Sequence, residues 1–152
     1  MSTSPYPDGI DCSWLASDQV GRLGVFITAG IGPIPATALD SANMPIEAIE
    51  ERLCQLPTVS SNQLLVTVKR PDSFIDLAER GFFVYDWTDI HRTKADELNV
   101  YESVAAPNEP IDIDALPDDL GVLARAMKLK GVEFEAGKAI DVRSFISCIE
   151  PI

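Results

Sequence analysis

The residues best suited to chemistry lie close together near the middle of the chain. Asp86, Asp89 and Arg92 surround His91, which is the only histidine. A histidine beside carboxylates can act as an acid or a base near neutral pH. The same residues could supply metal ligands, although a site with one histidine would need further carboxylates from elsewhere. An exposed polar loop explains these residues more simply, so we expect no enzyme, no catalytic residue, no metal and no cofactor.

Other catalytic signatures are missing from the sequence. No serine lies in a G-x-S-x-G elbow. The loop at residues 30–35 (GIGPIP) has two glycines, but its prolines remove amide donors and no lysine follows, which argues against a phosphate site. Cys12, Cys54 and Cys148 are an odd number and are widely spaced, which predicts free thiols; Cys12 and Cys54 lie on apolar stripes and are expected in the core.

Net charge is the strongest global property of the 152-residue chain. Twelve Lys and Arg against 24 Asp and Glu give a formal net charge of −12. Such a field repels nucleic acids and anionic membranes and attracts cationic proteins, although solubility alone also explains an acidic surface. No apolar run reaches the roughly 18–20 residues that span a bilayer, and the first residues do not resemble a signal peptide. We therefore expect a cytoplasmic protein with a protein partner, and neither nucleic acid nor membrane as a partner.

One long acidic span concentrates this charge. No Lys or Arg occurs between Lys94 and Arg125. Acids in the first turn of a helix are stabilised by its dipole, which explains two of the acids but not the absence of cations, because stable surfaces usually mix both signs. The predicted partner-binding residues are Glu109, Asp112, Asp114, Asp118 and Asp119.

The periodicity of apolar residues indicates which elements must position these groups. Helices are expected at 46–56, after Pro71 as far as Gly81, and from Asp114 or Asp118 to Met127. Strands are expected at 11–16 and 23–29 (a hairpin), 64–68 (a central strand), 82–87, 100–105, and 132–135 with 139–142 (a final hairpin).

This order lacks the strict alternation of a doubly wound fold. It predicts one α+β domain over residues 1–152, with residues 1–9 as a loose lead-in. A mixed or mainly antiparallel sheet should carry about three helices on one face. Trp14 and Trp87 are expected in its core because indole side chains bury a large apolar area.

Three segments carry a resemblance to a known class of proteins. They are residues 11–16 (DCSWLA), 28–35 (TAGIGPIP) and 81–87 (GFFVYDW). With the acidic composition, they resemble the small immunity proteins encoded beside bacterial polymorphic toxins of the Rhs and type VI secretion kind. The resemblance implies tight binding and occlusion of a cognate toxin, with acidic residues imitating phosphate where that toxin is a nuclease. The class has many unrelated folds and implies no particular site residue.

The function expected from the sequence is therefore a cytosolic immunity protein that binds a basic toxin domain through its acidic surface. Two alternatives stay open. One is a small hydrolase or metal-dependent enzyme that uses the Asp86, Asp89 and His91 loop. The other is a structural adaptor, for instance a homodimer built on an exposed sheet edge.

Overall fold

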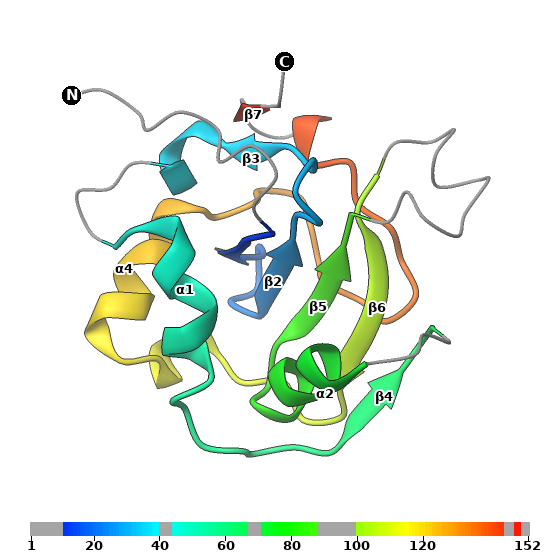
Figure 1. Ribbon diagram of the computed structural model, residues 1–152. Helices are drawn as coiled ribbons and strands as arrows, with labels where there is room; N and C mark the ends of the chain where they lie inside the picture. Colours follow the sequence, from blue (N-terminus) through cyan, green and yellow to red (C-terminus); the bar gives the residue numbers. More distant parts are fainter. Residues whose placement is uncertain (1–10, 40–43, 67–70, 88–99, 145–147, 150–152) are drawn as a thin grey trace.

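The computed structural model describes residues 11–39, 44–66, 71–87, 100–144 and 148–149, and it has the predicted α+β fold (Figure 1). A five-stranded mixed sheet has the order β1-β2-β5-β6-β4. Its strands are β1 (Ser13–Ser17), β2 (Leu23–Ile27), β5 (Phe83–Asp86), β6 (Glu102–Pro107) and β4 (Asn62–Leu64). The α-helices are α1 (Ile46–Leu53), α2 (Asp72–Glu79) and α4 (Asp118–Ala126). Two short strands, β3 (Ile34–Pro35) and β7 (Cys148–Ile149), pair beside this sheet.

Within the five-stranded sheet, three of the four strand pairs are antiparallel, and only β2 and β5 run parallel. The predicted first hairpin is confirmed: Ser13 lies opposite Ile27, and Ser17 lies opposite Leu23. The strands predicted at 82–87 and 100–105 are neighbours as β5 and β6. The β2–β5 pair is what makes the sheet mixed.

One strand prediction is wrong in its position. The apolar run at 64–68 was expected to form a central strand, but β4 pairs only with β6 and lies at the edge of the sheet. Leu64 and Leu65 are 39% and 36% exposed. An apolar run predicts a central strand only if both faces and both edges are covered. Here pairing begins at Asn62 and involves mostly polar residues, and residues 67–68 lie outside the described part of the chain.

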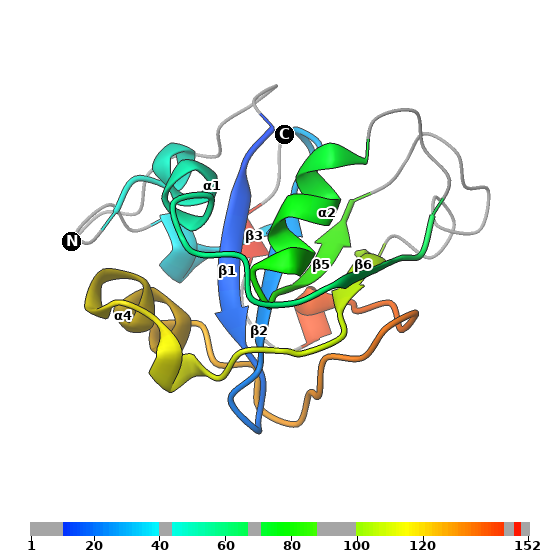
Figure 2. The ribbon, with the colours of Figure 1, turned by 90° about the horizontal axis from the view of Figure 1, so that it is seen from below.

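The three α-helices that the structure describes pack against one face of the sheet. Alternate residues of a strand point to opposite faces, and the two serines of β1 on the helix side contact helices directly. Ser13 Oγ donates to Glu50 Oε1 of α1 over 3.1 Å, and Ser17 Oγ donates to the Ala124 carbonyl of α4 over 2.7 Å. Helix α2 covers β4, β5 and β6. Figure 2 shows α1 and α2 on one side of the strands, with the orange C-terminal segment along the other.

The opposite face carries an aromatic cluster. Trp14 stacks on Phe26 with 4.2 Å between ring centroids, and Phe26 stacks on Tyr85 at 4.9 Å. The Tyr101 hydroxyl accepts from Trp14 Nε1 at 3.3 Å and donates to the Pro33 carbonyl at 2.9 Å. Trp87 is also buried, at 7% exposure. The core positions predicted for both tryptophans are confirmed.

The segment that covers this face is not the predicted C-terminal hairpin. Val132 and Phe134 are buried and Glu133 is exposed, as in a strand, but residues 132–135 and 139–142 form no ladder with each other. The Phe134 N–H donates to Asp18 Oδ2 at 2.8 Å, and the Val132 carbonyl accepts from Gln19 N at 2.9 Å. The hairpin prediction is wrong because these backbone groups bond to the β1–β2 turn instead.

The helix boundaries follow the local signals closely. Helix α1 begins after Pro45 and α4 begins at Asp118, the later of the two predicted starts. Cys54 follows α1 on the surface, so its predicted core position is wrong, whereas Cys12 is buried. Within the described residues, no helix has the length and apolarity to cross a membrane.

Candidate functional site

The five predicted binding acids lie on one surface connection between β6 and α4. The chain leaves buried β6 at Pro107, crosses the surface, and enters α4 at Asp118. All five residues are exposed. We call this set the acidic ledge: Glu109, Asp112, Asp114, Asp118 and Asp119.

The backbone of the acidic ledge is fixed to the rest of the domain. The Ile111 N–H donates to the Gly81 carbonyl at 3.2 Å, and the Ile113 N–H donates to the Gly21 carbonyl at 2.8 Å. These two glycines sit in the α2–β5 connection and the β1–β2 turn. A surface held at two points loses less conformational entropy when a partner binds.

Both anchoring positions require glycine. Gly21 has φ +94° and Gly81 has φ +97°, a region that side chains disfavour. A Cβ on Gly21 would lie 2.8 Å from Asp112 Oδ2, and a Cβ on Gly81 would lie 2.7 Å from Ile111 Cγ2. The close approach of the ledge to the core therefore depends on the absence of side chains here.

Two acids of the ledge have local structural roles. Asp112 caps the short 3-10 helix Ile113–Ala115, because its Oδ1 accepts from the Asp114 N–H at 3.0 Å. Asp114 Oδ1 lies 3.2 Å from Arg125 Nη2 in α4, with both side chains more than half exposed. Exposed pairs of this kind contribute little stability.

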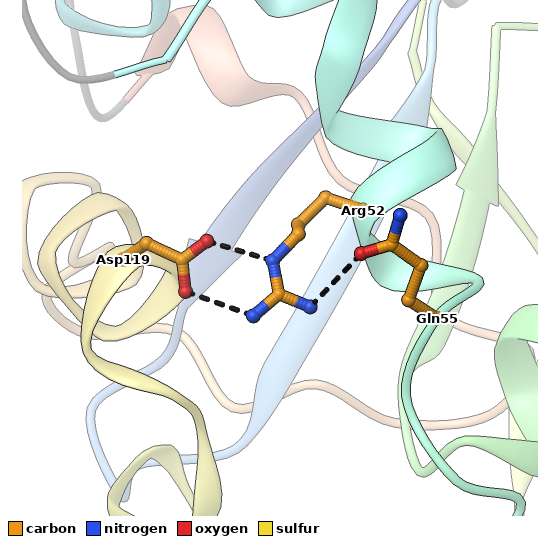
Figure 3. A network of polar contacts seen from close by, with 3 residues as sticks. All are labelled: Arg52, Gln55 and Asp119. Carbon is orange, nitrogen blue, oxygen red and sulfur yellow. Dashed lines mark hydrogen bonds and ion pairs between the residues drawn. The ribbon is translucent and has the colours of Figure 1, made fainter.

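Asp119 is bound much more tightly than the other acids (Figure 3). Arg52 of α1 donates to it twice, from Nε to Oδ2 at 2.7 Å and from Nη2 to Oδ1 at 3.1 Å. The third guanidinium nitrogen donates to Gln55 Oε1 at 3.4 Å. The hydrogen bonds from Arg52 lower the pKa of the Asp119 carboxyl below its ordinary value. This pair joins α1 to α4, so Asp119 is the member of the ledge least available to a partner.

Glu109, Asp112 and Asp118 carry the uncompensated charge. Within the described part of the chain, no Lys or Arg forms an ion pair with any of them. The sequence located the five acids but not this difference between them. Arg52 lies 67 positions from Asp119, and no local pattern pairs the two.

The hydrolase alternative falls largely outside the described residues. Asp86 ends β5 and is half-buried, whereas Asp89, His91 and Arg92 belong to 88–99. Among the residues that are described, no group of three or more His, Cys, Asp or Glu could hold a metal. The hydrolase reading of the His91 loop therefore stays an untested alternative.

Among the described residues, Asp18 in the β1–β2 turn has the most buried carboxylate. Its side chain accepts from the Val20 and Arg22 N–H groups as well as from Phe134. The nearby Tyr85 hydroxyl is buried beside the Glu135 backbone, and burial raises its pKa. Both groups are buried, and the bond from the Phe134 N–H to Asp18 attaches the segment that covers the aromatic face to the β1–β2 turn.

The fold and the ledge define a single-domain α+β protein with a fixed, exposed acidic surface. Comparisons of the chain with protein-family models, curated proteins and solved structures find no match.

Proposed function

We propose that this chain is a cytoplasmic immunity-type protein that binds a basic bacterial toxin domain through the acidic ledge and occludes it. The observation that carries the proposal is the exposed, uncompensated charge of Glu109, Asp112 and Asp118 on an anchored backbone. Charge complementarity speeds encounter and selects cationic partners, and apolar contacts supply the lasting hold. The net charge of −12 supports the same class of partner.

The test first looks for a basic toxin domain encoded beside the gene and then measures association with that domain at low and high salt. The double variant Glu109→Lys and Asp118→Lys reverses two unpaired charges and leaves the Asp112 cap and the Arg52–Asp119 pair intact. We expect association to slow roughly tenfold or more at low ionic strength. The effect should shrink at 0.15 M salt, where the Debye length is about 8 Å.

The matched control reverses two exposed acids elsewhere. Glu133→Lys with Glu135→Lys changes the net charge equally, on the C-terminal segment across the sheet from the helices, and the one ion pair that it breaks is the exposed contact of Glu135 with Lys138 at 3.8 Å. Circular dichroism should confirm that both double variants are folded. Equal slowing in the two would show that only net charge matters and would refute a role for the ledge.

A homodimer is the second candidate, and the position of β4 favours it. An edge strand exposes backbone donors and acceptors that another strand can pair with. Leu64 at the end of β4 and Leu65 directly after it are also exposed. Sedimentation at several protein concentrations tests this candidate. A single monomeric species throughout would exclude it.

A further inference from the structure

The two edges of the five-stranded sheet differ in how well they are covered. The edge strand β1 is buried at every residue, and the Ser17 N–H at its end donates to the Met127 carbonyl at 3.2 Å. The other edge strand, β4, is half-buried at Asn62 and exposed at the next two residues (Figure 1). Native sheets usually protect an edge with Lys, Pro, a bulge or a covering segment. Strand β4 contains neither Lys nor Pro, and its register with β6 is regular, so this edge is open.

The pairing of β4 with β6 fixes the direction of its backbone groups. The Leu65 N–H, directly after β4, donates to the Val104 carbonyl of β6 at 2.9 Å. In an antiparallel pair, alternate residues direct both backbone groups at the partner strand. The N–H and C=O groups of Leu64, and of Asn62 two residues earlier, therefore point away from the sheet. Among the described residues, none forms a hydrogen bond with these outward groups.

Exposed apolar side chains lie on both faces of this edge. The Asn62 side chain points toward α2, where its Nδ2 donates to Glu79 Oε2 at 2.9 Å. Successive side chains of a strand point to opposite faces, so Leu64 shares the face of Asn62 and Leu65 lies on the other. Both leucines are exposed. A strand that paired with the outward backbone groups would bring its own side chains against both of them.

The open edge begins where the acidic ledge begins. The Asn108 N–H donates to the Ser61 carbonyl at 3.0 Å, and the Glu109 N–H donates to Ser60 Oγ at 2.8 Å. Glu109 thus lies next to the residues that lead into β4. A partner that binds the ledge at Glu109 is therefore beside the open edge.

We propose that the toxin partner adds an extended segment to β4 as a further strand of the sheet, with one apolar side chain against Leu64 and another against Leu65. The inference rests on the proposed function for the existence of this partner and adds how the partner is held. Strand addition takes its affinity from main-chain hydrogen bonds and its specificity from alternate side chains. A second copy of this chain would compete for the same edge, but a net charge of −12 repels an identical copy and attracts a basic partner.

The test uses two short peptides as probes instead of the partner. An acetylated, amidated Lys-Thr-Val-Thr-Val-Thr-Lys peptide is titrated to millimolar concentration into ¹⁵N-labelled protein. The matched peptide carries N-methyl groups on its central Val-Thr-Val amides, which block strand pairing along either edge and keep the charge and the side chains. We expect the first peptide to shift the amide signals of Asn62 and Leu64 and to slow their hydrogen exchange. The methylated peptide should bind about tenfold more weakly, because it loses main-chain hydrogen bonds.

Two variants at one position separate the backbone from the side chain. Leu64→Pro removes an outward N–H and leaves the bond from Leu65 to β6 in place, and proline is tolerated on an edge strand where the N–H faces solvent. This variant should lose binding of the first peptide. The control Leu64→Ala keeps the N–H, removes most of the exposed side chain, and should weaken binding by only about two- to fivefold. If Leu64→Pro misfolds, the comparison of the two peptides still decides the question.

The outcomes distinguish strand addition from the proposed function. Equal binding of both peptides, shifts confined to the ledge, or no binding at all would overturn strand addition and leave the charge-reversal test of the ledge unaffected. A dimer that forms without peptide and is dissociated by Leu64→Pro would assign the edge to a second copy and also overturn the inference. Peptide binding at β4, combined with equal slowing in the charge-reversal variants and their control, would refute the ledge and leave the edge as a strand-binding site.

Discussion

The buried carboxylate of Asp18 should be one of the most sensitive positions in the domain. The residue is 0% exposed, and its Oδ1 accepts from the Val20 N–H at 3.0 Å and the Arg22 N–H at 2.9 Å. Its Oδ2 accepts from Phe134 N at 2.8 Å. One side chain therefore closes the β1–β2 turn and attaches the segment that covers the aromatic face.

The variant Asp18→Asn replaces one acceptor oxygen by an NH₂ donor. If the remaining oxygen still accepts from the Val20 and Arg22 N–H groups, the new NH₂ donor faces the Phe134 N–H. That buried N–H then has no acceptor. An unsatisfied buried donor costs about 1–3 kcal/mol. Asp18→Ala removes all three bonds, and the two part-buried N–H groups add about 0.5–1.5 kcal/mol each, for a total of roughly 2–6 kcal/mol.

Thermal unfolding measured by circular dichroism checks this order. A change of 1 kcal/mol shifts the midpoint of a domain of this size by about 2–4 °C, so Asp18→Asn should lower the midpoint by about 2–12 °C and Asp18→Ala by more. The control Asp76→Asn removes an exposed carboxylate in α2 and should stay within about 0.5 kcal/mol of the parent.

Two results would refute the reasoning about Asp18. Equal midpoints for Asp18→Asn and the parent protein would mean that the Phe134 N–H does not depend on this carboxylate. Equal losses in Asp18→Asn and Asp18→Ala would mean that the two turn bonds contribute nothing.

Two further predictions concern packing and the ledge. Gly24→Ala would place a Cβ 2.9 Å from the Phe134 ring, so urea unfolding should show that the free energy of unfolding falls by about 1–3 kcal/mol. Adding Phe134→Leu should recover part of this loss. A loss that this second change leaves unaffected would contradict the contact. The lowered pKa of Asp119 means that its pairing with Arg52 stabilises the fold at neutral pH. This contribution is lost as the pH falls below the ordinary value of about 3.9 and through the lowered pKa, so the stability gap between the parent and Asp119→Asn should close in acid; a gap independent of pH would rule the pairing out.

Local patterns in the sequence predicted much of this fold because the structures they describe are local. The 11–16 and 23–29 strands form a hairpin across a short turn, and three helices begin close to a proline with apolar residues at helical spacing. Within the aromatic run at 82–87, Tyr85 of β5 packs against Phe26 of β2, stacked at 4.9 Å, and against Phe134, tilted at 5.6 Å.

The two strand errors have a common physical origin. Val132 and Phe134 in the segment predicted as a strand at 132–135 are buried, but burial does not determine where a backbone N–H finds its acceptor. The acceptor of Phe134 is Asp18, 116 positions earlier in the chain. The run at 64–68 likewise indicated apolar residues, but the order of strands in the sheet depends on long-range pairing that the run does not encode.

The same distinction applies to the acidic ledge. Its exposure was predictable, because prolines and acids between two buried elements form a surface connection. Its division into paired and unpaired charges was not, because Arg52 comes from a distant helix. Arg52 already pairs with Asp119, so this acid has little charge left to attract a cationic partner. The charges that remain unpaired are those of Glu109, Asp112 and Asp118. A partner chosen by these residues should therefore respond to Glu109 and Asp118 far more than to Asp119, although the five acids look equivalent in the sequence.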